Sequence, residues 1–216
     1  MSTRLSLIGL ALTSFTLVNA AGFTANFDSM AEGDFAPTIQ SGGINFYNLD
    51  RNLPGGGDVF CVEESNAGDL GAHFSAPNVM GFGGYVPGNG TSFGRLKSFE
   101  FNLTDPGYEM RSVELDFWTF MLSTAGNTVH LEGWKGASLV DQMSWSPTSF
   151  IVDHVSLALA SDDYDRFVIR SEGPIDNGVV FANFDNVHIS AQAVPEPTTM
   201  AVVGLGLTAL LRRRRK

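Results

Sequence analysis

The 216-residue sequence contains one cysteine, Cys61. A single thiol cannot close a disulfide within the chain, which excludes a small domain held together by disulfides. The run from Asp58 to Val62 around it is largely apolar, so Cys61 is predicted to be a small buried side chain. Stability therefore has to come from burial of a hydrophobic core.

Basic residues are scarce as well: the sequence has 13 Lys and Arg against 23 Asp and Glu. Six of the basic residues are Arg4 and the carboxyl-terminal cluster 212–216. Without these six and Glu196, 7 basic and 22 acidic residues remain, a net charge of −15. Such an acidic body repels nucleic acid and anionic polysaccharide, and nucleic acid is therefore excluded as a partner.

Histidine-based catalytic motifs and a phosphate-binding loop are missing. The four histidines, His73, His130, His154 and His188, form neither a His-x-His nor an HExxH motif. The glycines around Gly55 lack the Lys-Ser/Thr that completes a phosphate-binding loop. The sequence thus predicts no catalytic residues. Two carboxylates are enough for glycoside hydrolysis, however, which keeps a secreted glycan-active hydrolase as an alternative.

What the sequence does have is a strand-forming composition, with 17 Phe, 24 Gly and no amphipathic helix of useful length. Alternating apolar and polar residues between Gly- and Pro-rich turns predict an all-β domain, an antiparallel two-sheet β-sandwich with a jelly-roll-like topology. The predicted strands are 23–27, 44–49, 59–62, 99–103, 112–120, 128–134, 139–145, 152–159, 166–170, 179–184 and 187–189.

The amino-terminal residues are typical of a secretory signal peptide. Arg4 supplies a positive n-region, residues 5–18 an apolar h-region, and residues 18–20 a small-residue cleavage site. We predict cleavage by signal peptidase after Ala20 or Ala21. The alternative is a first buried helix of the domain, but the residues from Gly22 onward change at once to the alternation of a strand.

The carboxyl-terminal residues form three parts in order: Val-Pro-Glu-Pro at 194–197, an apolar stretch at 198–211 and a basic cluster at 212–216. The prolines keep the first part extended, as a processing enzyme requires. The 14-residue apolar stretch is shorter than the roughly 20 residues that cross a bilayer comfortably. The basic cluster holds the carboxyl terminus on the cytoplasmic side.

This three-part order resembles the PEP-CTERM sorting domain of Gram-negative bacteria. The resemblance implies recognition by exosortase, a membrane cysteine transpeptidase, and an association with exopolysaccharide and biofilm production. A plain membrane anchor explains the apolar stretch and the arginines but not the Pro-Glu-Pro, and a GPI signal normally ends with its apolar tail. By the same resemblance, the sorting motif is Val194, Pro195, Glu196 and Pro197, and the stop-transfer cluster is Arg212, Arg213, Arg214 and Arg215.

These features predict a signal peptide at 1–20, a β-sandwich domain at 21–193 and a sorting and transmembrane anchor segment at 194–216. We expect an exported protein that is anchored in the inner membrane before processing and then resides in the extracellular matrix or on the outer cell surface. Its body is predicted to be non-catalytic, with binding of extracellular polysaccharide as its candidate activity. A purely structural matrix protein is a further alternative.

The tripeptide Asn-Phe-Asp occurs at 26–28 and again at 183–185. If the first and last strands of the body pair, Asp28 and Asp185 could supply oxygen ligands to a structural calcium ion, as in related sandwiches. The alternative is a pair of turn carboxylates that bond local backbone amides.

The three tryptophans are candidate glycan contacts, because aromatic faces stack on sugar rings and an exposed Trp on a sheet is costly without a use. They are Trp118, Trp134 and Trp145. The alternative is that they fill the core. Trp134 shares a strand face with His130 and Glu132, which favours exposure of that side chain.

Overall fold

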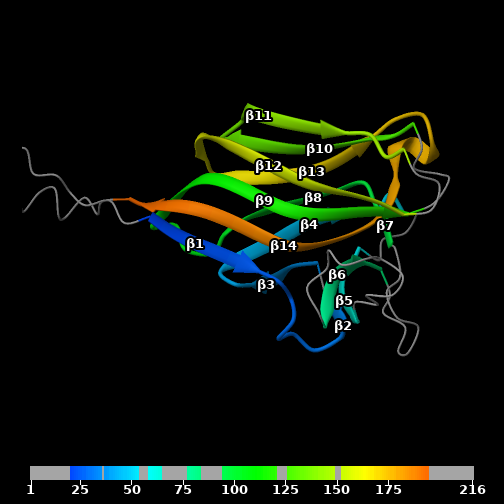
Figure 1. The fold of residues 1–216 in the computed structure, drawn as a ribbon, viewed down its shortest axis with the longest axis horizontal. Coiled ribbons are helices and arrows are strands. Elements are labelled where there is room, and N and C mark those ends of the chain that lie inside the picture. The colour runs from blue at the N-terminus through cyan, green and yellow to red at the C-terminus, as the bar shows by residue number, and fades with distance from the viewer. Residues whose placement is uncertain are drawn as a thin grey trace, which may run out of the picture. The chain divides into compact units, whose positions relative to one another are not determined.

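The computed structural model describes residues 20–35, 37–53, 58–64, 77–83, 94–120, 126–148 and 152–194. Residues Ala20–Val194 form one compact unit of two antiparallel β-sheets (Figure 1). The predicted h-region, the Pro-Glu-Pro, the apolar stretch and the arginine cluster lie outside the described residues. Within the described ranges, no helix is long and apolar enough to cross a membrane.

The first sheet, sheet A, has the strand order β12-β9-β14-β6-β5-β2. The last strand of the chain, β14, is its organising element: β9 pairs along one side, and β7, β6 and β1 pair in turn along the other. Figure 1 shows β1, β14, β9 and β12 side by side along the long axis, with β2, β5 and β6 gathered at one end. The bounds are β1 Ala20–Ala25, β2 Gly33–Phe35, β5 Phe60–Glu64, β6 Asn78–Phe82, β7 Gly94–Leu96, β9 Tyr108–Phe120, β12 Val152–Tyr164 and β14 Val180–Ala193.

The second sheet, sheet B, has the order β11-β10-β13-β8-β4-β3. Its strands are connected locally, since β10 and β11 form a hairpin and β3 pairs with β4. A short 3-10 turn at Asp176–Gly178 connects β13 to β14, and so joins the two sheets. The bounds are β3 Ile39–Ser41, β4 Ile44–Asp50, β8 Ser98–Leu103, β10 Thr128–Lys135, β11 Ser138–Trp145 and β13 Arg166–Glu172.

Phenylalanine rings from both sheets build the core between them. Phe184 of β14 stacks on Phe99 of β8 with 4.8 Å between ring centroids, and it also contacts Phe27, Phe46 and Phe82. Each aromatic pair stabilises the fold by about 0.5–1.5 kcal/mol beyond the area it buries. Every second residue of a strand faces the opposite sheet, and phenylalanine occupies many of these core positions. This explains the abundance of Phe in the sequence.

The all-β prediction and the two antiparallel sheets are confirmed, and most predicted strands are present. Three short strands and β6 were not predicted from the sequence: β2, β3 and β7 have only three residues each, and β6 is buried on both faces and shows no alternation. The predicted break between strands 179–184 and 187–189 was wrong. The strand continues through a bulge at Asn186, whose positive φ of 50° shifts the register without ending the pairing.

Candidate functional site

Trp134 lies near the end of β10 on the outer face of sheet B, and its indole is half-buried. Its Nε1–H donates to Glu132 Oε2 over 3.0 Å, which fixes the ring edge. The guanidinium of Arg166, directly across on β13, lies 4.9 Å from the ring centroid in a cation–π contact. The indole is therefore held in one orientation beside both a carboxylate and a guanidinium.

Polar side chains extend from Trp134 across the outer face of sheet B. The register places Glu132, Val168, Glu100 and Tyr47 in one row over β10, β13, β8 and β4. Arg166 Nε lies 3.3 Å from Glu100 Oε2 and connects this row to the indole. Burial, and then the Glu100 carboxylate, raises the pKa of Tyr47, so its hydroxyl remains a hydrogen-bond donor at neutral and mildly basic pH.

One step further along the same face, Arg170 joins two carboxylates. It donates to Glu132 Oε1 through Nε and Nη2, both at 2.8 Å, and it also pairs with Glu172. Glu132 is only 4% exposed, so the guanidinium is the main compensation for a buried negative charge. His130, 7% exposed, bonds Ser144 and Gln142 on β11, and its Nε2 lies 3.1 Å from Glu172.

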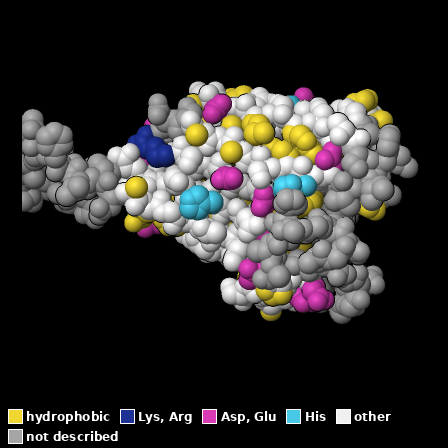
Figure 2. All heavy atoms as spheres, viewed as in Figure 1, with side chains coloured by type: hydrophobic (Ala, Val, Ile, Leu, Met, Phe, Trp, Pro, Cys, Tyr) yellow, Lys and Arg dark blue, Asp and Glu magenta, His cyan; other side chains and the backbone are white. Residues whose placement is uncertain are grey.

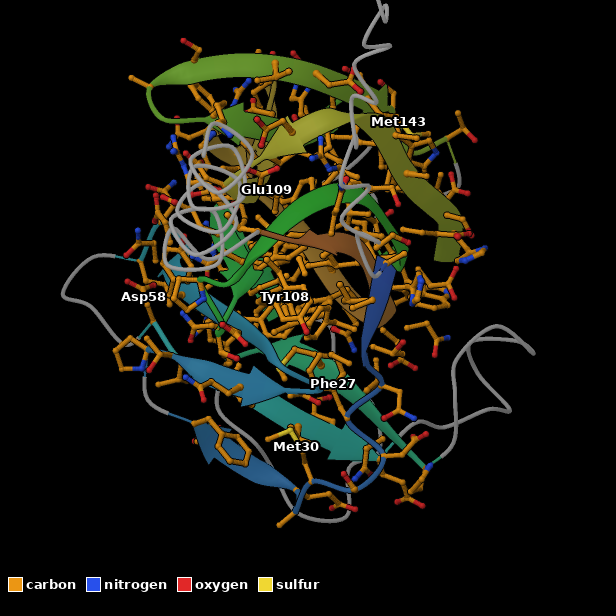
Figure 3. The ribbon with its side chains drawn as sticks, turned by 90° about the vertical axis from the view of Figure 1, so that its left-hand side faces the viewer. Phe27, Met30, Asp58, Tyr108, Glu109 and Met143 are labelled. Atoms are coloured by element: carbon orange, nitrogen blue, oxygen red, sulfur yellow. The ribbon has the colours of Figure 1, made fainter. Side chains whose placement is uncertain are left out.

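An acidic pocket of about 280 Å³ opens at the end of the sandwich next to Trp134. Its size is near the lower end of small-molecule sites, which span roughly 300–1,000 Å³. Lys135 and Asp165, the covalent neighbours of Trp134 and Arg166, line it, and Figure 3 looks at this end and labels Tyr108 and Glu109. The lining residues are Asn102, Leu103, Asp105, Pro106, Tyr108, Glu109, Met110, Lys135, Asp163, Tyr164 and Asp165.

Local packing determines how Tyr164, one of the lining residues, is placed. Gly133 has no side chain, and a Cβ at this position would lie 2.3 Å from the ring of Tyr164. The absence of a side chain lets Tyr164 lie across β10, where its hydroxyl donates to Asp141 Oδ2 at 3.1 Å. Lys135 pairs with Asp163, and Arg111 with Glu109 at 2.7 Å, so part of the negative charge of the pocket is compensated.

The other two tryptophans have different surroundings. Trp118 of β9 is 0% exposed, with its ring 4.6 Å from that of His154, and it presents no face to solvent. Trp145 of β11 is half-buried and meets Phe117 edge to face at 6.4 Å. Trp134 and Trp145 are thus both half-buried, Trp118 is fully buried, and the ring of Trp134 lies beside a carboxylate and a guanidinium. Glycan contact by these tryptophans stays a prediction.

The first and last strands of the body, β1 and β14, are antiparallel neighbours, as the calcium prediction required. Asp28 lies just after the end of β1, and Asp185 lies within β14. Asp28 accepts hydrogen bonds from the Asn26 side-chain amide at 2.9 Å and from the backbone amide of Asn78, at the start of β6, at 3.3 Å. Asp185 is instead fully buried within β14. No group of three or more His, Cys, Asp or Glu residues in the described ranges is arranged to hold a metal ion. Calcium binding by this pair stays a prediction.

Cys61 is fully buried in β5, and its thiol donates to Glu63 Oε1 at 2.9 Å. Burial, and then the Glu63 carboxylate, raises the pKa of the thiol well above its ordinary value. The thiol is thus protonated and unreactive, as the apolar sequence around it indicates.

The acidic pocket is the feature that sequence reasoning missed. Its residues come from three separate segments, 102–110, 135 and 163–165, which only the packing of the sandwich brings together. The one local signal is the turn Asp105-Pro-Gly, whose Asp105 Oδ1 accepts from the Gly107 amide at 2.8 Å. That signal predicts a turn and says nothing of a pocket.

The molecule is thus an all-β sandwich with an aromatic and charged surface on sheet B and an acidic pocket beside it. Residues 193–216 match the PEP-CTERM protein-sorting motif. The chain therefore carries this sorting motif, which implies an exported protein with a carboxyl-terminal tail. No curated protein matches the sequence.

Several solved structures resemble the chain at low identity. The K2 cleaved adhesin domain of Lys-gingipain is 12% identical with a TM-score of 0.46, covering 78% of this chain and 97% of that one. The K1 cleaved adhesin domain of Lys-gingipain from Porphyromonas gingivalis W83 is 9% identical with a TM-score of 0.40, covering 78% and 97%. TmCBM61 in complex with β-1,4-galactotriose is 14% identical with a TM-score of 0.38, covering 76% and 93%.

Proposed function

We propose that this protein is exported by its signal peptide, processed by exosortase at the Pro-Glu-Pro tail and placed in the exopolysaccharide matrix or on the outer cell surface. The matched sorting motif at residues 193–216 is the observation that carries this proposal. Replacing Pro195, Glu196 and Pro197 by Ala should leave export intact but trap the full-length protein in the membrane. Release of a mature-size protein from this variant would contradict exosortase sorting.

We further propose that the body is a non-catalytic glycan-binding module whose contact surface is centred on Trp134. Its fixed indole offers apolar contact to the C–H face of a sugar ring, and Glu132, Glu100 and Arg166 offer partners for hydroxyl groups. The net charge of −15 for the chain without its two ends disfavours polyanions. The ligand class is therefore a neutral or amino-sugar polysaccharide.

Affinity electrophoresis against neutral and amino-sugar polysaccharides, including exopolysaccharide from the native host, tests this proposal. We expect retardation of the wild-type protein and its loss in Trp134→Ala. The matched control is Ile175→Ala in the β13–β14 connection, an apolar side chain that is 37% exposed and lies beside Asn127, at the opposite end of β10 from Trp134. Equal retardation of wild type and Trp134→Ala would reject this surface, and no retardation at all would favour the purely structural alternative.

The acidic pocket favours one second candidate, a glycan-active hydrolase. Four carboxylates, Asp105, Glu109, Asp163 and Asp165, line it, and two suitably spaced carboxylates are sufficient for glycoside hydrolysis. Release of reducing ends from a bound polysaccharide, abolished in Glu109→Gln or Asp163→Asn, would establish this activity. Binding without release of reducing ends would favour the non-catalytic module.

A further inference from the structure

Three amide side chains form a row across sheet B, on strands β3, β4 and β8. The register pairs Gln40 with Asn45, and Asn45 with Asn102. Their neighbours along β4 and β8, Phe46 and Phe101, face the core, so the amides lie on the outer face. Gln40 is exposed, and Asn45 and Asn102 are half-buried. We call Gln40, Asn45 and Asn102 the amide row.

The amide row leads directly to the surface centred on Trp134. Arg166 lies one residue beyond the pair Phe167↔Phe101, at the same end of that pair as Asn102, and it pairs in turn with Trp134. The amides, the guanidinium and the indole thus occupy five adjacent strands in the order β3, β4, β8, β13 and β10. Neighbouring strands are about 4.8 Å apart, so these five positions span about 19 Å.

The amide row differs from the adjacent part of this face in its hydrogen bonding. The carboxylates beside it are engaged, since Glu100 pairs with Arg166 and Glu132 with Arg170. In the part of the chain that the structure describes, none of the three amide side chains makes a hydrogen bond. An amide has two N–H donors and an oxygen with two lone pairs. The amide row therefore presents unused donors and acceptors to solvent.

The chemistry of these five positions selects among polysaccharides. A sugar hydroxyl both donates and accepts a hydrogen bond, which matches the two functions of an amide. None of the five positions carries a carboxylate, so the ammonium group of a free amino sugar has no ionic partner there. The net charge of −15 for the chain without its two ends disfavours an acidic polysaccharide. A neutral glycan is the ligand that fits.

We propose that a neutral polysaccharide binds in an extended form across the strands of sheet B, from Trp134 over Arg166 and along the amide row to Gln40. This inference rests on the glycan-binding surface proposed above, and it adds the direction, the length and the charge class of the bound chain. The indole stacks on one sugar, and the amides bond to hydroxyl groups of the units further along. A sugar unit of an extended chain is about as long as one strand spacing, so the site holds about four or five units.

Binding of size-graded oligosaccharides tests the length of the site. The fragments are prepared by partial hydrolysis of exopolysaccharide from the native host, and their affinity is measured by titration calorimetry. We expect affinity to rise with each unit up to about four or five and then to remain constant. Constant affinity from the disaccharide onward, or binding of charged fragments only, would overturn the inference. If neither the fragments nor the intact polysaccharides bind, the proposed glycan-binding function itself fails.

Variants of the amide row test which residues contact the longer fragments. Asn45→Ala should weaken binding of a pentasaccharide about two- to tenfold, the effect of losing one hydrogen bond. It should leave a disaccharide unaffected, because a disaccharide stacked on Trp134 does not reach β4. Trp134→Ala should weaken binding of both fragments. Asn45→Asp keeps the shape of the side chain but removes its donors, and it should weaken the pentasaccharide as Asn45→Ala does.

The matched control is Gln192→Ala, which removes a half-buried amide from β14 of sheet A and should change the affinity of neither fragment. Thermal midpoints show that each variant is folded. Wild-type affinity of both Asn45 variants for the pentasaccharide, together with a loss in Trp134→Ala, would overturn the inference and leave the surface at Trp134 in place.

Discussion

The outer faces of the two sheets each carry a tryptophan among polar residues, but the two side chains differ in how deeply they are buried. On sheet A, Trp118 is 0% exposed, and its neighbours Asn183 and Asp185 are also fully buried. On sheet B, Trp134 remains half-exposed beside charged side chains that are paired with one another. Figure 2 shows the sheet A side, where Asp and Glu side chains are scattered over the described surface.

The polar residues of the two faces are also compensated in different ways. On sheet A, Asp116 accepts hydrogen bonds from Ser156 at 2.7 Å and Asn186 at 3.0 Å and lies 3.3 Å from His154 Nε2. On sheet B, Arg170 and Arg166 compensate carboxylates by ion pairing. The aromatic residue on the outer face of sheet A is thus fully buried, whereas the one on sheet B keeps part of its ring exposed.

The largest expected effect is on the stability contributed by Trp118. Trp118→Ala should lower the free energy of unfolding by about 3–5 kcal/mol, because it leaves a cavity at a fully buried position. Trp134→Ala should lower it by only about 1 kcal/mol, since that ring is half-exposed. Chemical denaturation of both variants measures the difference. Equal losses would break the comparison between the two faces.

A smaller effect is expected from the ion pair on sheet B. Arg170→Ala should cost about 1–3 kcal/mol, because Glu132 is then buried without its cation. The double variant Arg170→Ala with Glu132→Gln should recover part of this loss, since the neutral amide can still accept from Trp134. A double variant that is less stable than Arg170→Ala, measured by urea unfolding, would show that the buried charge is not the cause.

Asn183 on sheet A allows a prediction of opposite sign. Its amide is 0% exposed, and neither its Nδ2 nor its Oδ1 makes a hydrogen bond in the described part of the chain. Asn183→Leu should raise the free energy of unfolding by about 1 kcal/mol, because an apolar side chain of similar size removes the unsatisfied groups. Asn183→Asp serves as the control and should destabilise. A destabilised Leu variant would show that the amide has a partner in the folded protein.

The smallest effect concerns pH. Hydrogen bonding and charge from Arg170, with a further contribution from His130, lower the pKa of Glu172. The carboxylate therefore stabilises the fold above its unfolded pKa, near 4.3, and this contribution is lost as pH falls through the lower folded pKa. Thermal midpoints of wild type and Glu172→Gln should differ slightly at pH 7 and converge as the pH falls through the folded pKa of Glu172. A difference that persists unchanged at low pH would contradict this origin.

The strands of the core were predictable because one face of each is buried. In β9, Val113, Leu115 and Phe117 face the core while Glu114 and Asp116 do not, and this alternation is visible in the sequence. In β6 every residue is buried, so the alternation is lost and the strand could not be predicted. The bulge at Asn186 was mistaken for a break, because Asp-Asn is also typical of turns.

The candidate site was only partly predictable, for a similar reason. Trp134 was a candidate together with Trp118 and Trp145, and the polar residues on its strand face favoured exposure of Trp134, but the sequence did not separate the burial of Trp118 from that of Trp145. The acidic pocket was not predictable, since Asp105, Lys135 and Asp163 are distant in the sequence. Contacts between separate segments depend on how the sheets pack and not on local composition.

The sequence by itself determined the class of fold, the acidic charge and the sorting motif at 193–216, because periodicity, composition and a contiguous motif are properties of local order along the chain. The tertiary structure alone decided that Trp118 is buried and Trp134 half-exposed, that a pocket lies beside Asp165, and that β14 is paired on both sides up to the sorting motif. Burial and strand pairing depend on which residues are neighbours in space, and the order of residues along the chain does not give these neighbours.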